Sequence, residues 1–263
     1  MDVCTQVLEI LRGGLPTSAV NAPIILPELY RKLQPSVALV EKMGALYAQH
    51  FVRGKGGKIG GRTFELRYHG ELASMDNTKP LFAALVKGLV SGFSDSHINI
   101  VNATLIAKEK GITINETRSQ DSKTYANLVS LRAYDENDGQ GQYQVIEGYA
   151  SQKRLYISKL DRFNASFPPE GTLIVLHNYD EPGKIGGVGT VLGGHGINIR
   201  FMQVASLDAG ARPEGTGSES EENKGVEALM ILGVQAADGK VSEAVLEDLR
   251  KSEGVLNVSL VQL

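Results

Sequence analysis

The chain has few of the residues that mark specialised classes of protein. Its 263 residues include one cysteine, Cys4, and no tryptophan. One cysteine cannot form an internal disulfide framework or ligate an iron–sulfur cluster by itself. His177 and His195 stand alone, without the spacing of metal ligands. We therefore expect a soluble protein of a reducing compartment, with no metal site in this chain.

Strong charge and long apolar runs are also lacking. The formal net charge is −3, which gives no basic footprint for nucleic acid. No apolar run approaches the roughly 18 residues of a membrane span, and no secretory signal precedes the first expected helix. With 42% hydrophobic and 22% charged residues, the composition suits two modest globular domains. We expect neither nucleic acid nor a membrane as a partner.

The C-terminal part alternates between strand and helix patterns. Apolar residues recur at helical spacing after Pro182, which suits a first helical turn, and Ser242 is placed to cap a second helix. The segment from Asp208 to Gly225 is rich in Gly, Ser and Glu, so we expect a solvated loop. The order βαββαβ predicts a ferredoxin-like sandwich. The expected strands are residues 172–178, 197–207, 226–234 and a last strand with Leu256, Val258 and Leu260, and the first expected helix is 183–195.

Because several kinds of protein share this topology, function has to be argued from the site. An RNA-recognition module needs aromatic side chains on its central strands, and the third strand here, Val226 to Leu232, has none. A dinucleotide site needs a glycine turn that opens a helix. The glycines from Gly187 to Gly193 follow the expected helix start, and Ile59 replaces the third glycine of the stretch Gly54 to Gly61. The sequence therefore predicts no NAD cofactor bound to this chain.

The most specific motif is a strand, an acidic turn and a glycine-rich helix, HNYDEPGKIGGVGTVL, followed by GHGINI and by the closing EGVLNVSLVQL. These segments resemble the ACT domain, and more closely the one that ends long-form D-3-phosphoglycerate dehydrogenases. The resemblance implies that L-serine, as feedback inhibitor, binds across a two-fold interface of a homo-oligomer, either a dimer or a tetramer. Position by position, it assigns Asn178, Asp180 and Asn198 to L-serine.

The chemistry of these three residues fits that ligand. Asp180 can accept hydrogen bonds from the serine ammonium, and the two asparagines can pair with the hydroxyl or the carboxylate. Structural roles are the alternatives: Asp180 can cap the following helix, and Asn198 can take a left-handed backbone after Gly196. The family varies at the position of Asn178.

Residues 24–163 predict a separate α/β domain. Residues 164–171, with Pro168-Pro169, read as the hinge into the C-terminal domain, 172–263. Within the first domain we expect helices near residues 28–50, 79–93 and 98–110, a strand over 64–72 and a hairpin that joins 127–134 to 142–150.

The first domain resembles the allosteric substrate-binding domain that lies between the catalytic core and the ACT domain of the longer dehydrogenases. The matching segments are LVEKMGALYAQ, FSDSHINIVNATLIAKEKGI and LVSLRAY. The resemblance implies binding of a phosphate or an anionic substrate through basic side chains. Arg118, Lys123 and Arg132 are the candidates, because Arg and Lys can clamp a phosphate. Solvated surface charge is the alternative for all three.

Residues 1–23 resemble the final helix of a 2-hydroxyacid dehydrogenase nucleotide-binding domain and its exit segment. The catalytic core and its NAD are then expected upstream, and this chain is expected to hold no catalytic residue. The resemblances together predict the regulatory region of D-3-phosphoglycerate dehydrogenase, an enzyme of L-serine biosynthesis. They imply a cytoplasmic location, or the plastid stroma in a photosynthetic eukaryote. The alternatives are part of an iron–sulfur L-serine dehydratase and an ACT module that senses another small amino acid.

Overall fold

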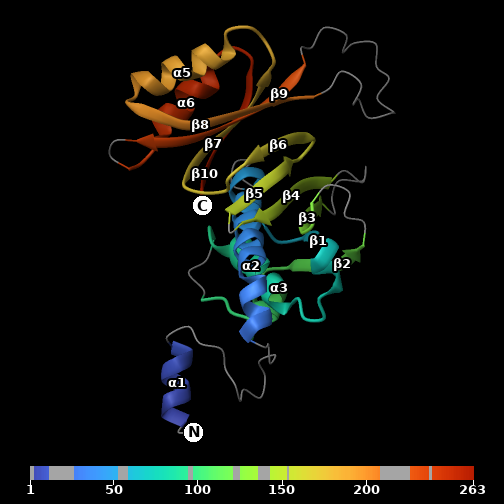
Figure 1. Ribbon diagram of the computed structural model, residues 1–263. Helices are drawn as coiled ribbons and strands as arrows, with labels where there is room; N and C mark the ends of the chain where they lie inside the picture. Colours follow the sequence, from blue (N-terminus) through green and yellow to red (C-terminus); the bar gives the residue numbers. More distant parts are fainter. Residues whose placement is uncertain are drawn as a thin grey trace.

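The computed structural model describes residues 3–11, 27–52, 59–93, 97–120, 125–135, 143–152, 154–207, 226–236 and 239–263. It contains a short helix, α1 (Val3–Leu11), and two sheets with helices packed on them (Figure 1). The mixed α and β class expected from the sequence is confirmed. Lys123, the turn at 137–139, the loop at 208–225 and residues 12–23 lie outside the described residues.

The first sheet, sheet A, has six strands and is mixed: β1 pairs in parallel with β2, and the other neighbours are antiparallel. In β1 the side chains of Phe64, Leu66 and Tyr68 are buried, while Glu65 and Arg67 point to the opposite face. This alternation is expected of a strand with one face against a core. In spatial order the strands are β2 (Ile112–Ser119), β1 (Arg62–His69), β3 (Leu128–Asp135), β4 (Tyr143–Ser151), β5 (Arg154–Leu160) and β6 (Phe163–Phe167).

Helices cover one face of sheet A. Helix α2 contacts β3, β4 and β5, and α3 packs along α2. The two helices approach closely at Gly44 and Gly88, since a Cβ atom on Gly88 would lie 2.0 Å from the carbonyl oxygen of Glu41. The elements are α2 (Pro27–Tyr47), the π-helix η1 (Ala48–Val52), the 3-10 helix η3 (Gly70–Ser74), α3 (Lys79–Val90) and α4 (Ala103–Glu109).

The second sheet, sheet B, has four strands in the order β10-β7-β9-β8, and all its neighbours are antiparallel. Helices α5 and α6 lie on one face (Figure 1), where they enclose a core that includes Ile174, Leu176 and Leu249. The elements follow one another as β, α, β, β, α and β, in the expected order. They are β7 (Thr172–Tyr179), α5 (Lys184–Gly194), β8 (Ile197–Ser206), β9 (Glu227–Ala236), α6 (Glu243–Lys251) and β10 (Val255–Gln262).

The other face of sheet B packs against the first unit, where β6 contacts β8 and β9, and η1 contacts β10. One continuous apolar core therefore joins Phe163 and Phe167 of β6 to Leu173, Val175 and Val261 of sheet B. The segment expected to be a hinge, 164–171, is in part strand: residues 164–167 belong to β6. Phe163, Ala165 and Phe167 alternate with exposed residues, which is why this stretch pairs as an edge strand of sheet A.

Candidate functional site

Asn178 lies near the end of β7, on the face of sheet B that the helices cover. The residue is 4% exposed. Its Nδ2 donates a hydrogen bond of 2.8 Å to the carbonyl oxygen of Tyr179, whereas its buried Oδ1 has no partner among the described residues. Buried polar atoms nearly always have a partner, so this acceptor calls for one, which a bound water or a ligand can supply.

A cavity of about 300 Å³ lies beside Asn178. One wall is the first turn of α5, and the other is the loop between α6 and β10. This volume is at the lower end of the range for small-molecule sites. Its lining includes Asn178, Gly183, Lys184, Ser252, Glu253 and Val255.

Asp180 lies just beyond β7, at the surface. Its Oδ2 accepts a hydrogen bond of 2.5 Å from the hydroxyl of Ser206, the last residue of β8. The N-cap of α5 is Gly183, which has a left-handed backbone with φ of 90° and no side-chain cap. The alternative in which Asp180 caps this helix is therefore wrong. Asp180 instead ties the acidic turn to the end of the edge strand β8.

Asn198 is exposed near the start of β8, where it pairs with Gln235 of β9. The left-handed residue here is Gly196, and Asn198 is not among the described non-glycine residues with positive φ, so that alternative is also wrong. Strands β7 and β8 both run antiparallel to β9 and are therefore parallel to each other. Asn178 and Asn198 consequently lie at opposite ends of the sheet within one chain.

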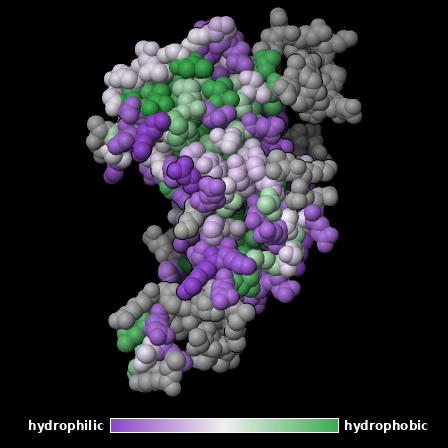
Figure 2. All heavy atoms as spheres, in the orientation of Figure 1, coloured by the Kyte–Doolittle hydropathy of each residue, from purple (hydrophilic) through white to green (hydrophobic). Residues whose placement is uncertain are grey.

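The surface around β8 is partly apolar. Ile185 of α5 is 54% exposed, and Phe201, Met202 and Val204 of β8 are half-buried. In Figure 2 hydrophobic surface gathers over this part of the molecule. Strand β8 is an edge of sheet B, so it also presents unpaired backbone groups.

The three anion candidates do not form one cluster. Lys123 lies outside the described residues. Arg132 of β3 is paired with Glu65 and lies on the face of sheet A away from the helices. Arg118 of β2 is paired with Tyr68, whose ring is buried against the helices, so its side chain points to the opposite face from that of Arg132.

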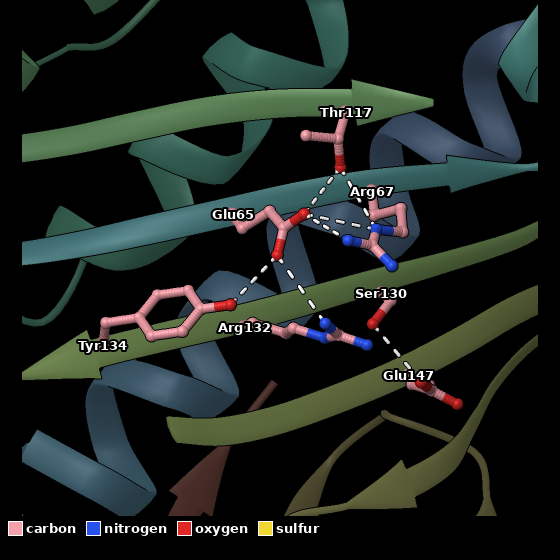
Figure 3. Close-up of polar contacts among 7 residues, drawn as sticks. All are labelled: Glu65, Arg67, Thr117, Ser130, Arg132, Tyr134 and Glu147. Atoms are coloured by element: carbon pink, nitrogen blue, oxygen red, sulfur yellow. Dashed lines mark hydrogen bonds and ion pairs between the residues drawn. The ribbon is translucent and has the colours of Figure 1, made fainter. Parts of the chain in front are cut away.

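Arg132 belongs to a polar network around Glu65 (Figure 3). Glu65 accepts hydrogen bonds from Arg67 at 2.7 Å, Thr117 at 2.8 Å and Tyr134 at 3.1 Å. Arg132 approaches the same carboxylate at 3.8 Å. Partial burial acts to raise the pKa of Glu65, but the hydrogen bonds and the charge of Arg67 outweigh it and hold the pKa below its usual value. The carboxylate therefore stays ionised and fixes the cations beside it.

A second polar cluster joins the two units. His50 of η1 and Ser259 of β10 are both buried, and His50 Nδ1 lies 2.6 Å from Ser259 Oγ. At the surface, Arg162 and Glu227 form an ion pair of 2.6 Å between the β5–β6 turn and β9. Sequence reasoning missed these contacts. The only signal was that polar residues occur within apolar strands.

The described residues contain neither a metal-binding cluster nor a membrane-spanning helix. They hold no group of three or more His, Cys, Asp or Glu side chains placed to bind a metal ion. No described helix is long and apolar enough to cross a membrane.

Comparison with known proteins adds a family relationship. Residues 32–153 match the family described as the D-3-phosphoglycerate dehydrogenase intervening domain. The chain is 30% identical over its whole length to a D-3-phosphoglycerate dehydrogenase of Synechocystis, and 32% identical over 99% of its length to one of Methanocaldococcus jannaschii. D-3-phosphoglycerate dehydrogenase 3, chloroplastic, of Arabidopsis thaliana is 32% identical over 95% of the chain.

The extent of these matches is informative. The chain spans 43%, 44% and 41% of the length of the three relatives, so it corresponds to less than half of each. The family match covers most of sheet A and its helices, and the alignments to the relatives extend over sheet B as well. The chain therefore contains a region related to D-3-phosphoglycerate dehydrogenase.

Proposed function

We propose that the chain is the regulatory region of a D-3-phosphoglycerate dehydrogenase and that it binds L-serine between two copies of sheet B. The observation that carries this proposal is the parallel course of β7 and β8. In one chain it keeps Asn198 apart from Asn178 and Asp180. Ser206, the partner of Asp180, lies eight positions after Asn198 along β8, which is about 27 Å at 3.4 Å per residue.

A two-fold axis removes that separation. If β8 of one copy pairs antiparallel with β8 of another, the start of one strand comes to lie beside the end of its partner. Asn198 of one copy then approaches Asp180 of the other, and the apolar surface of β8 becomes covered. Pairing also satisfies the open edge of β8, which would otherwise invite uncontrolled association. The proposed assembly is a dimer, or a tetramer built from such dimers.

In this proposal the chemistry is divided between the two copies. Asp180 accepts from the ligand ammonium, and the amides of Asn178 and Asn198 pair with its carboxylate or hydroxyl. Oxidation of 3-phosphoglycerate and binding of NAD belong to a catalytic core outside this chain. The proposed locations are the cytoplasm and, in a photosynthetic eukaryote, the plastid stroma.

A second candidate function rests on Arg132. Its buried Nε has no hydrogen-bond partner among the described residues, although the guanidinium also stacks over Tyr143. We propose that this guanidinium, whose side chain is 27% exposed, is available to a phosphate or carboxylate on the face of sheet A away from the helices, without Arg118. Titration with inorganic phosphate tests the idea: Arg132→Gln should abolish binding that Arg118→Gln leaves intact. Equal effects of the two substitutions would contradict it.

The main proposal is tested by calorimetric titration combined with sedimentation. L-Serine should bind, glycine and L-alanine should bind more weakly because they lack the hydroxyl, and serine should strengthen an even-numbered oligomer. If the chain stays monomeric at all accessible concentrations and still binds serine, the site cannot be formed by two copies. Tighter binding of another small amino acid would favour a module that senses a different ligand.

A further inference from the structure

Lys184 is a polar residue of the Asn178 cavity that the proposed ligand set does not use. It is the first residue of α5, and its side chain is only 17% exposed. Its Nζ donates a hydrogen bond of 2.5 Å to the carbonyl oxygen of Glu253 and lies 2.9 Å from Oε2 of Glu181. The ammonium thus bridges the two loops that form the cavity walls.

The neighbours of this ammonium leave capacity for a ligand. An ammonium carries three N–H donors, whereas its partners among the described residues are one carbonyl and one carboxylate whose side chain is 50% exposed. Glu181 is therefore in contact with solvent, and a ligand anion can replace it at low cost. The N-terminal end of α5 adds a favourable field for an anion at the same wall.

Whereas Lys184 presents a hydrogen-bond donor to the cavity, Asn178 presents an acceptor. Its buried Oδ1 is an acceptor that lacks a donor. A ligand that fills the cavity should therefore bring a hydrogen-bond donor to Asn178 and a negative charge to Lys184. Small amino acids and small hydroxy acids have both groups within a few bonds of each other.

We propose that Lys184 binds the carboxylate of the ligand and thereby makes the cavity selective for small amino or hydroxy acids over their uncharged analogues. The proposal rests on the proposed function and deepens it by giving the carboxylate a partner within the same chain as Asn178. Asp180 then accepts from the ligand ammonium, and Asn198 of the second copy closes the site.

The test compares L-serine with L-serinamide, which lacks the carboxylate. In the intact chain L-serine should bind at least about ten-fold more tightly than L-serinamide. Lys184→Met should weaken L-serine by about ten-fold or more and leave L-serinamide unchanged, because only the carboxylate contact is lost. Lys184→Arg should restore much of the preference. Lys251→Met is the matched control, since Lys251 is a 73% exposed lysine of α6.

The outcomes separate the two proposals. Equal weakening of both ligands by Lys184→Met would show that Lys184 only holds the loops together and would overturn the inference. If Lys184→Met leaves the affinity for L-serine unchanged, the inference about Lys184 is overturned while the proposed function stands. Binding that depends on Lys184 but not on Asn198 would uphold the inference and refute the two-copy site. Failure of the intact chain to bind any small amino or hydroxy acid would overturn both.

Discussion

His50 and His177 stack face to face across the boundary between the two units, with ring centroids 5.6 Å apart and planes inclined by 20°. His177 also meets the ring of Phe163 edge-on at 5.5 Å. His177 directly precedes Asn178 in β7, and the two side chains point to opposite faces of sheet B. The strand that carries the candidate ligand residue therefore carries the interdomain contact on its other side.

The hydrogen bond between His50 and Ser259 predicts a loss of stability on substitution. Ser259→Ala should lower the free energy of unfolding by about 1–3 kcal/mol, because it removes a buried partner of the His50 ring. Urea unfolding measures this. Ser74→Ala, at an exposed serine of η3, should change stability by less than about 0.5 kcal/mol. If both substitutions changed the free energy of unfolding equally, the hydrogen bond between His50 and Ser259 would contribute nothing measurable to stability.

Glycines in two helices predict opposite effects of the same substitution. Gly88→Ala should destabilise by about 1–3 kcal/mol or more, because the new Cβ would overlap the Glu41 carbonyl of α2. Gly193→Ala in α5 meets no atom within 4 Å and should stabilise by about 0.5–1 kcal/mol through helix propensity. Thermal melts measure both. A stabilising Gly88→Ala would contradict the close crossing of α2 and α3.

The Glu65 network predicts a pH dependence. Because the folded state lowers the pKa of Glu65 from its ordinary value of 4.5, its contribution to stability is complete above that pH. The contribution is lost as pH falls through the lower folded-state pKa. The stability difference between the parent chain and Glu65→Gln should therefore shrink below about pH 4.5. Glu109→Gln, at an exposed glutamate of α4, should run parallel to the parent chain.

The proposed serine site predicts graded effects on affinity. Asp180→Ala and Asn198→Ala should each weaken L-serine binding by about 1–3 kcal/mol, the usual effect of losing a charge-assisted or buried hydrogen bond. Asn178→Ala should cost less, because its Nδ2 already donates to the carbonyl of Tyr179 and only its Oδ1 is left for the ligand. Thermal melts without serine control for structural loss, since Asp180 also holds Ser206. A lower melting temperature with intact serine affinity would make Asp180 purely structural.

The chain on its own should not oxidise 3-phosphoglycerate with NAD. The glycines from Gly187 to Gly193 lie inside α5, which begins at Lys184, whereas a phosphate-binding glycine turn must open its helix. Absorbance of NADH at saturating substrate measures the activity. Turnover above background by the purified chain would contradict assignment of catalysis to another part of the enzyme.

Much of the second unit could be predicted from sequence, because local patterns determine it. Residues 173–176 form a short continuous apolar run typical of a strand buried on both faces, and apolar residues of α5 recur at helical spacing, so strand and helix follow directly. The motif also pointed to Asn178, which lines the cavity. Lys184 was overlooked because its contact with Glu253, a residue distant in sequence, is made only by the fold.

Other features depend on relationships that no local pattern encodes. Arg118 and Arg132 read as one basic set, yet the register of β2 and β3 against β1 sends them to opposite faces. The double proline suggested a hinge, but the strand before it is held by the apolar faces of both sheets. The stack of His50 and His177 depends on how the two units pack together, which the local sequence around either histidine does not predict.

The core shared by β6 and sheet B bears on how this protein can be engineered. Sheet B with α5 and α6 is the part of this chain that one would move to another protein as a cassette. A cassette cut at Gly171 would bare Leu173, Val175 and Val261 and would aggregate or bind surfaces indiscriminately. A successful transplant has to carry β6 and η1 with it, or replace these apolar side chains with polar ones.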